Sequence, residues 1–165
     1  MNQSTELLIQ KPTGTVMRIK ILSAHNITMQ KLFASAASYT VLGLLAGVFY
    51  REFTRAQDFV GMTRLSTLHT HLLVLGTIMF LVLLALSAVF KLHEHKQFNA
   101  FFIVYNVGVL WITAFMAVKG INQVLDPSFT MSPALAGASG LGHIILTVGF
   151  FQLFMILGKQ LKKYS

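Results

Sequence analysis

Four long apolar runs are the feature that most limits what this chain can fold into. They cover residues 32–50, 65–90, 98–118 and 138–157, and charged residues stand at most of their ends. A helix that crosses the hydrocarbon core of a bilayer needs about 20 mostly apolar residues. Only 11% of the 165 residues are charged, whereas a soluble domain has about 25%. The sequence therefore predicts an all-α integral membrane protein, a single domain over 1–165, with four spanning helices.

The distribution of lysine and arginine predicts the orientation of these helices. Positive residues dominate the segment 1–30, the connection between the second and third runs, and the C-terminus, whereas acidic residues dilute them in the other two connections. Short loops rich in Lys and Arg stay in the cytoplasm. We therefore expect a cytoplasmic N-terminal segment over 1–30, a cytoplasmic C-terminus, and an up-down-up-down four-helix bundle, because the connections are short.

Net charge and cysteine content exclude several classes of function. The formal net charge is +8, but the positive residues mark the ends of apolar runs and do not form a basic patch with interleaved aromatic residues. No nucleic-acid partner is therefore expected. The chain has no Cys, which excludes disulfides, iron–sulfur clusters and covalently attached haem.

Ionisable side chains inside a membrane are rare and usually functional, and three histidines fall inside the apolar runs. His69 and His71 begin the second run, and His143 lies in the fourth. Counted from Leu65 and Ala138 at about 1.5 Å per residue, His69 and His143 both lie about 6–8 Å below the outer boundary. In a square bundle their helices would be diagonal, with axes about 14 Å apart. This spacing suits a flat macrocycle between two axial imidazoles. The HEH of the connection at 93–95 is read as a solvated turn.

The register of the second helix decides which of its histidines faces inward. His69 and His71 point about 200° apart on an α-helix, so only one of them can share a ligand with His143. Small residues share the face of each preferred histidine, Gly76 with His69 and Gly140 with His143. Such residues mark close approach to a neighbouring helix or to a flat ligand. We expect His69 and His143 to be the metal ligands. His71 is left to form a hydrogen bond within the bundle, or to replace His69 if the register differs.

Other residues near these helices have secondary roles in this interpretation. Arg64, one turn above His69, is expected to pair with haem propionates, whereas the neighbouring cations anchor helix ends. Gly43 and Gly47 have the spacing of a helix–helix contact. Asn106 and Thr113 share a face as a buried polar pair or as hydrogen-bonding groups for a cofactor, and Trp111 is placed to pack on a ring.

The stretch LHTHLLVLG resembles the second-helix motif of the catalytic subunits of haem–copper oxidases and nitric oxide reductases. That motif is Leu-His-Thr-Asn before an apolar run, and its histidine is an axial ligand of low-spin haem b. The resemblance implies that His69 is a haem ligand and that His71 replaces the Asn. It covers about one helix of four, and the copper histidines and second haem of the oxidases have no counterpart. It therefore implies haem binding without oxygen reduction.

Most of the chain, including GLGHIILTVGFFQLF, also resembles an uncharacterised family of small four-helix bacterial membrane proteins. This second resemblance implies a multi-pass location in the bacterial cytoplasmic membrane.

These features predict a membrane-embedded protein that binds haem b. Two axial histidines would suit electron transport or haem handling, and a single one would leave a position for NO or O2. The sequence shows no nucleophile–base pair and no paired carboxylates, so it favours a protein that is not an enzyme and leaves a small haem oxidoreductase open. Membrane lipid, a redox partner and a second copy of the chain are the expected partners.

Two alternatives remain at this point. The first is binding or transport of a divalent or copper ion through His69 or His71, His143 and Met79. The second is a structural subunit of a larger membrane complex, in which the histidines form hydrogen bonds between helices.

Overall fold

The computed structural model describes residues 13–126 and 128–163, with side chains from residue 28 onward. These residues are helical apart from short connections. Three consecutive segments form one continuous rod over Leu65–Phe90, called the second span below. The elements in chain order are α1 (Thr13–Ala56), α2 (Leu65–His71), the π-helix η1 (Leu72–Ile78), α3 (Met79–Phe90), the 3₁₀-helix η2 (Leu92–Glu94), α4 (Phe98–Leu125) and α5 (Pro133–Leu161).

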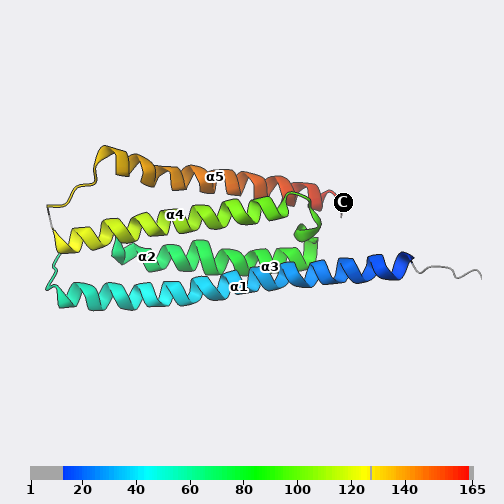
Figure 1. Ribbon diagram of the computed structural model, residues 1–165, viewed down its shortest axis with the longest axis horizontal. Coiled ribbons are helices and arrows are strands. Elements are labelled where there is room, and N and C mark those ends of the chain that lie inside the picture. The colour runs from blue at the N-terminus through cyan, green and yellow to red at the C-terminus, as the bar shows by residue number, and fades with distance from the viewer. Residues whose placement is uncertain (1–12, 127, 164–165) are drawn as a thin grey trace, which may run out of the picture.

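Four helices in the described part of the chain are long and apolar enough to cross a membrane, namely Thr28–Ala56, Leu65–Phe90, Phe98–Leu125 and Pro133–Leu161. The prediction of an all-helical, four-span chain is therefore confirmed. Consecutive rods run in opposite directions, so the start of α1 and the end of α5 lie at the same end of the molecule (Figure 1). We call this the η2 end, and the opposite end the α2 end.

Three of the helices extend beyond the apolar runs that predict them. Lys and Arg end an apolar run but are good helix formers, so α1 starts at Thr13, inside the segment expected to precede the first span. Residues 1–12 lie outside the described residues. The start of α5 is set by its capping residues. Pro133 occupies the first turn, and the Ser132 hydroxyl accepts a hydrogen bond from the Leu135 N–H at 3.3 Å.

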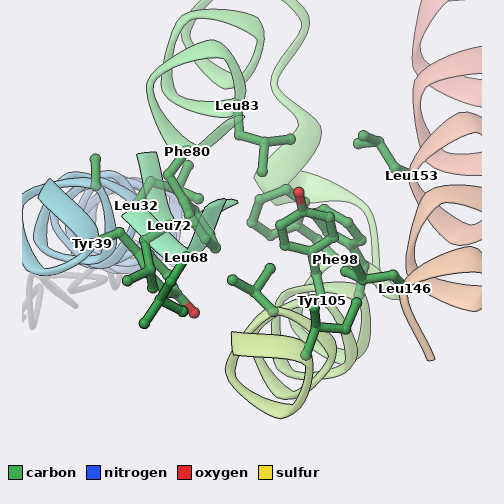
Figure 2. Packing of buried hydrophobic residues seen from close by; sticks show 14 of the residues in the cluster. Leu32, Tyr39, Leu68, Leu72, Phe80, Leu83, Phe98, Tyr105, Leu146 and Leu153 are labelled. Atoms are coloured by element: carbon green, nitrogen blue, oxygen red, sulfur yellow. The ribbon is translucent and has the colours of Figure 1, made fainter. Parts of the chain in front are cut away.

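The four rods form a row and not the closed square expected from the sequence. α1 packs along the second span, the second span packs on α4, and α4 packs on α5. Figure 2 shows α1 and α5 at opposite edges, with the second span and α4 between them. At the η2 end, α5 contacts α3 of the second span and also η2, which follows that span. At the α2 end, the second span and α5 are therefore separated, with α4 as their common neighbour.

Aromatic side chains fill the centre of this row. The rings of Tyr39 and Phe80 stack with centroids 5.6 Å apart, and the edge of Tyr105 meets Phe80 at 5.8 Å (Figure 2). Offset and edge-to-face contacts of this kind are the favoured geometries of aromatic pairs. The Tyr39 hydroxyl donates a hydrogen bond to Oδ1 of Asn106 at 2.9 Å. This bond connects α1 to α4. It also gives each of the two polar groups a hydrogen-bond partner, which the hydrocarbon chains of a lipid could not provide.

The π-helix η1 starts directly after His71 and widens the middle of the second span. π-helical turns are rare and are often found at functional sites. Tyr105 donates its hydroxyl hydrogen to the Leu75 carbonyl oxygen at 3.0 Å, so α4 supplies a partner to the backbone of this segment. A Cβ atom on Gly76 would overlap the Tyr39 side chain. The segment is therefore fixed between α1 and α4.

Candidate cofactor site

A cavity of about 260 Å³ lies between the second span, α4 and α5 near the α2 end, and it is partly open to the outside. It brings together two of the three histidines of the apolar runs and two cationic side chains. Its lining residues are Arg64 directly before the second span, His71 within it, Ile112, Phe115, Met116 and Lys119 from α4, and Ser139 and His143 from α5.

The way in which α5 packs on α4 leaves room for this cavity. Gly142 lies against Ile112 and Trp111, where an added Cβ would come within 2.9 Å of the Trp111 ring. The Trp111 indole donates a hydrogen bond to the Ala138 carbonyl oxygen at 2.8 Å. One flank of α5 is therefore fixed to α4. The neighbouring flank, which carries His143, faces the gap toward α2.

The orientation of the His71 ring follows from one hydrogen bond. Its Nδ1 lies 2.9 Å from the carbonyl oxygen of Thr67, one turn earlier in the helix. A carbonyl oxygen can only accept, so Nδ1 carries the hydrogen. In the neutral imidazole, Nε2 then has a free lone pair, and this is the arrangement typical of metal-binding histidines, whose second nitrogen donates to a backbone carbonyl or carboxylate.

His143 supplies the second imidazole of the cavity. Its side chain is exposed, and its backbone carbonyl accepts a hydrogen bond from the Thr147 hydroxyl at 2.8 Å. Within residues 28–126 and 128–163, neither ring nitrogen of His143 has a hydrogen-bond partner. The imidazole is therefore available to a ligand.

The charged side chains among the described lining residues are both positive, Arg64 and Lys119, and no carboxylate of the described part lines the cavity. The ion pairs of the described side chains, Arg51 with Glu52 and Lys91 with Glu94, involve neither cation. Such a cavity favours a ligand that carries negative charge near the α2 end.

His69 points away from this cavity and toward α1. A Cβ atom on Gly47 would lie 3.7 Å from Cβ of His69, and one on Gly43 would lie 3.5 Å from the His69 carbonyl oxygen. Nδ1 of His69 is buried without a hydrogen-bond partner in the described part, and Nε2 lies 3.4 Å from Oγ1 of Thr70. The expected meeting of His69 with His143 is therefore not found, because α1 and not a shared cavity occupies the His69 face.

The two glycines expected at the cofactor also lie elsewhere. Gly76 faces Tyr39 of α1, so the small residues on the His69 face mark a helix contact. Gly140 is exposed, and an added Cβ there would meet nothing within 4 Å. Of the six residues predicted for the site, the cavity contains His71, His143 and Arg64.

Other expectations near the site can be compared directly with the structure. The Gly43–Gly47 spacing does mark a helix–helix contact. Asn106 is satisfied by Tyr39 of α1, and Thr113 bonds to the carbonyl oxygen of Val109 in its own helix. Met79 packs on the core, whereas Met116, which the sequence analysis did not single out, lines the cavity. The spacing of Ile112, Met116 and Lys119 on one helical face is the signal that could have identified it.

The number of metal-binding side chains restricts what this cavity can hold. In the part of the chain that the structure describes, no three His, Cys, Asp or Glu side chains come together. A zinc site uses three or four protein ligands. A haem iron takes only its axial ligands from the protein, so two histidines suffice.

The fold and the cavity define a multi-pass membrane protein in which two histidines and two cationic side chains line one cavity near the α2 end. The chain belongs to the family described as "Protein of unknown function (DUF2871)", whose model matches residues 29–160. The matched range contains all four spans except their outermost residues, Thr28 and Leu161, and all the residues that line this cavity. No curated protein and no solved structure matches the chain. The comparisons thus agree with the resemblance to an uncharacterised family and add nothing to the likeness to haem–copper oxidases.

Proposed function

We propose that this protein binds haem b in the cavity between α2, α4 and α5 and transfers electrons in the bacterial cytoplasmic membrane, with both termini in the cytoplasm. One observation carries the proposal. A single cavity combines two imidazoles from different helices with two cations, and no carboxylate stands among its described lining residues. Haem b matches this set, because its iron binds imidazole nitrogen and its propionates are anionic.

Each lining residue has a definite role in this proposal. His71 and His143 are the axial ligands, and the Thr67 carbonyl orients the His71 ring. Arg64 and Lys119 pair with the propionates, and the apolar side chains of α4 pack against the macrocycle. When bound through two histidines, haem supplies one-electron chemistry without an open position for a gas. The electrons would pass to or from a separate redox partner.

The proposed His71 ligand lies two residues after the histidine that the oxidase motif implies. The proposed ligand therefore lies on the same helix and at a similar depth as the histidine of the oxidase motif, but it is a different residue. His69 is the natural control, because it occupies the same helix turn and faces α1.

The test is an absorption spectrum of protein purified from cells with adequate haem supply. Wild-type protein is expected to show a Soret band and, on reduction, sharp α and β bands that carbon monoxide does not shift. His71→Ala and His143→Ala should each lose the six-coordinate spectrum, and His69→Ala should retain it. A colourless wild-type protein, or loss of the spectrum in His69→Ala alone, would contradict the proposal. A shift on adding carbon monoxide would replace electron transfer by gas binding at a five-coordinate iron.

Met116 favours a second candidate function, the binding of Cu(I). Its thioether lines the same cavity as His71 and His143, and thioether and imidazole ligands suit copper. The two cations beside them oppose a bare cation, which is why haem is preferred. Elemental analysis separates the two proposals. The copper site predicts one copper per chain, lost in Met116→Leu, and no chromophore from haem.

A further inference from the structure

A second cavity, of about 230 Å³, lies at the η2 end and is independent of the proposed haem site. Three parts of the chain build it: α1, the connection that contains η2, and the first turns of α4. Its lining includes Lys31 from α1, Glu94, His95 and Lys96 from the connection, and Phe98 and Phe102 from α4.

Positive charge dominates this cavity and its surroundings. Lys31 and Lys96 line it, and Lys159 in the last turn of α5 and Lys163 just after that helix act electrostatically on His95. Desolvation, followed by these lysine charges and that of Lys96, holds the pKa of His95 below its usual 6.5. The acidic lining residue is Glu94, whose carboxylate lies 4.0 Å from Nζ of Lys91. Among the described lining residues, lysines therefore outnumber carboxylates.

The tautomer of His95 adds a hydrogen-bond donor. The backbone N–H of Gln97 donates to Nδ1 of His95 at 3.2 Å. Nδ1 is thus the acceptor nitrogen, and in the neutral ring Nε2 carries the hydrogen. Even uncharged, this side chain can donate to an anionic oxygen.

The cavity also has an apolar side. Phe98 is 4% exposed and belongs to the core, and Phe102 packs against that core. The cavity therefore lies where the membrane-spanning part of the bundle meets its cationic end. A ligand that fits both parts has an anionic head and an apolar tail.

We propose that this cavity binds the phosphate group of an anionic phospholipid, with Lys31, His95 and Lys96 as its contacts. Basic pockets between spanning helices on the cytoplasmic side are a recognised binding mode for anionic lipid head groups. The aromatic wall favours a lipid phosphate over a soluble one, since soluble phosphate would leave the apolar side without a partner.

Native mass spectrometry of the full chain, released from detergent micelles that contain phosphatidylglycerol, measures how much of this lipid the protein retains. Each lysine near a membrane surface contributes about 1 kcal/mol, or about fivefold in affinity. Lys31→Gln/Lys96→Gln should therefore lose more than tenfold in retained phosphatidylglycerol, and Lys31→Arg/Lys96→Arg should retain it. Lys162→Gln, which removes a charge outside the cavity, is the matched control and should change retention less than twofold.

Two outcomes would overturn the proposal. Equal retention of phosphatidylglycerol and phosphatidylcholine would show that the head-group charge is not recognised. Displacement of the lipid by inorganic phosphate at low millimolar concentration would assign the cavity to a soluble anion. A monodisperse elution profile for every variant separates lost binding from lost folding.

Discussion

Nδ1 of His71 lies 2.9 Å from the carbonyl oxygen of Thr67, and this contact fixes which nitrogen of the ring can bind a metal. We expect the ligand-free protein to contain His71 as the Nδ1–H tautomer. Nitrogen-15 NMR of histidine-labelled protein, assigned by comparison with His71→Gln, measures this directly. Detection of the Nε2–H tautomer would remove the free lone pair on which the proposed iron ligation depends.

Gly76 and Gly140 should respond in opposite ways to an added methyl group. Gly76→Ala places Cβ on the Tyr39 side chain, and such overpacking costs about 1–3 kcal/mol in the free energy of unfolding. Gly140→Ala lies inside α5 and its Cβ meets nothing within 4 Å, so it should raise that free energy by about 0.5–1 kcal/mol, because Ala favours the helix interior over Gly. Thermal or denaturant unfolding in detergent compares the two. Equal effects would show that α1 is not packed on the second span as described.

Arg64 and Lys119 should contribute to haem affinity through charge. Arg64→Gln and Lys119→Gln each remove one cation from the cavity lining, and the loss of a partly exposed charged hydrogen bond costs about 1 kcal/mol, or about fivefold in Kd. Haem titration of the ligand-free protein measures the change. Arg51→Gln removes a cation that pairs with Glu52 outside the cavity and should leave the Kd unchanged. A matching loss in Arg51→Gln would attribute the effect to net charge alone.

His95 should titrate below 6.5 in a neutral detergent, because desolvation and the charges of Lys159, Lys163 and Lys96 disfavour its protonated form. The unfolded chain binds this proton more tightly than the folded one. The folded state therefore loses stability as the pH falls through 6.5 toward the lowered pKa. Lys159→Gln should raise the pKa without restoring 6.5, since desolvation is the largest cause. An NMR titration of His95 gives both values, and a pKa at or above 6.5 in wild-type protein would contradict the assignment.

The number of spans was predictable because bilayer thickness sets a minimum length for an apolar run, and charges stand at most of the run ends. Both ends of the second span, Leu65 and Phe90, coincide with the limits of its apolar run. Helix ends elsewhere were less predictable, because Lys and Arg stop a membrane run without stopping a helix. The placement of both termini in the cytoplasm stays a prediction.

The inward face of the second span was not predictable from spacing. Small residues on the His69 face were consistent with either a cofactor or a helix, and the structure shows that Gly76 meets Tyr39. Sequence spacing cannot tell which neighbour a face will meet. The HEH connection was interpreted as a solvated turn for the same reason: nothing local to it indicates that Lys31, on a distant helix, completes a cavity with it.

The π-helix that follows His71 determines how the second span would respond to the loss of one residue. Each residue of an α-helix advances the side chains by about 100°. A π-helix joins residues i and i+5 where an α-helix joins i and i+4, so Leu72–Ile78 contains one residue more than an α-helix needs to turn through the same angle. Deleting one residue from this stretch would let it rewind as ordinary α-helix and leave His71 in nearly the same orientation relative to α3. Deleting one residue from α3 instead would turn the lower half of the rod by about 100° relative to His71, so the place of a deletion in this rod matters as much as its length.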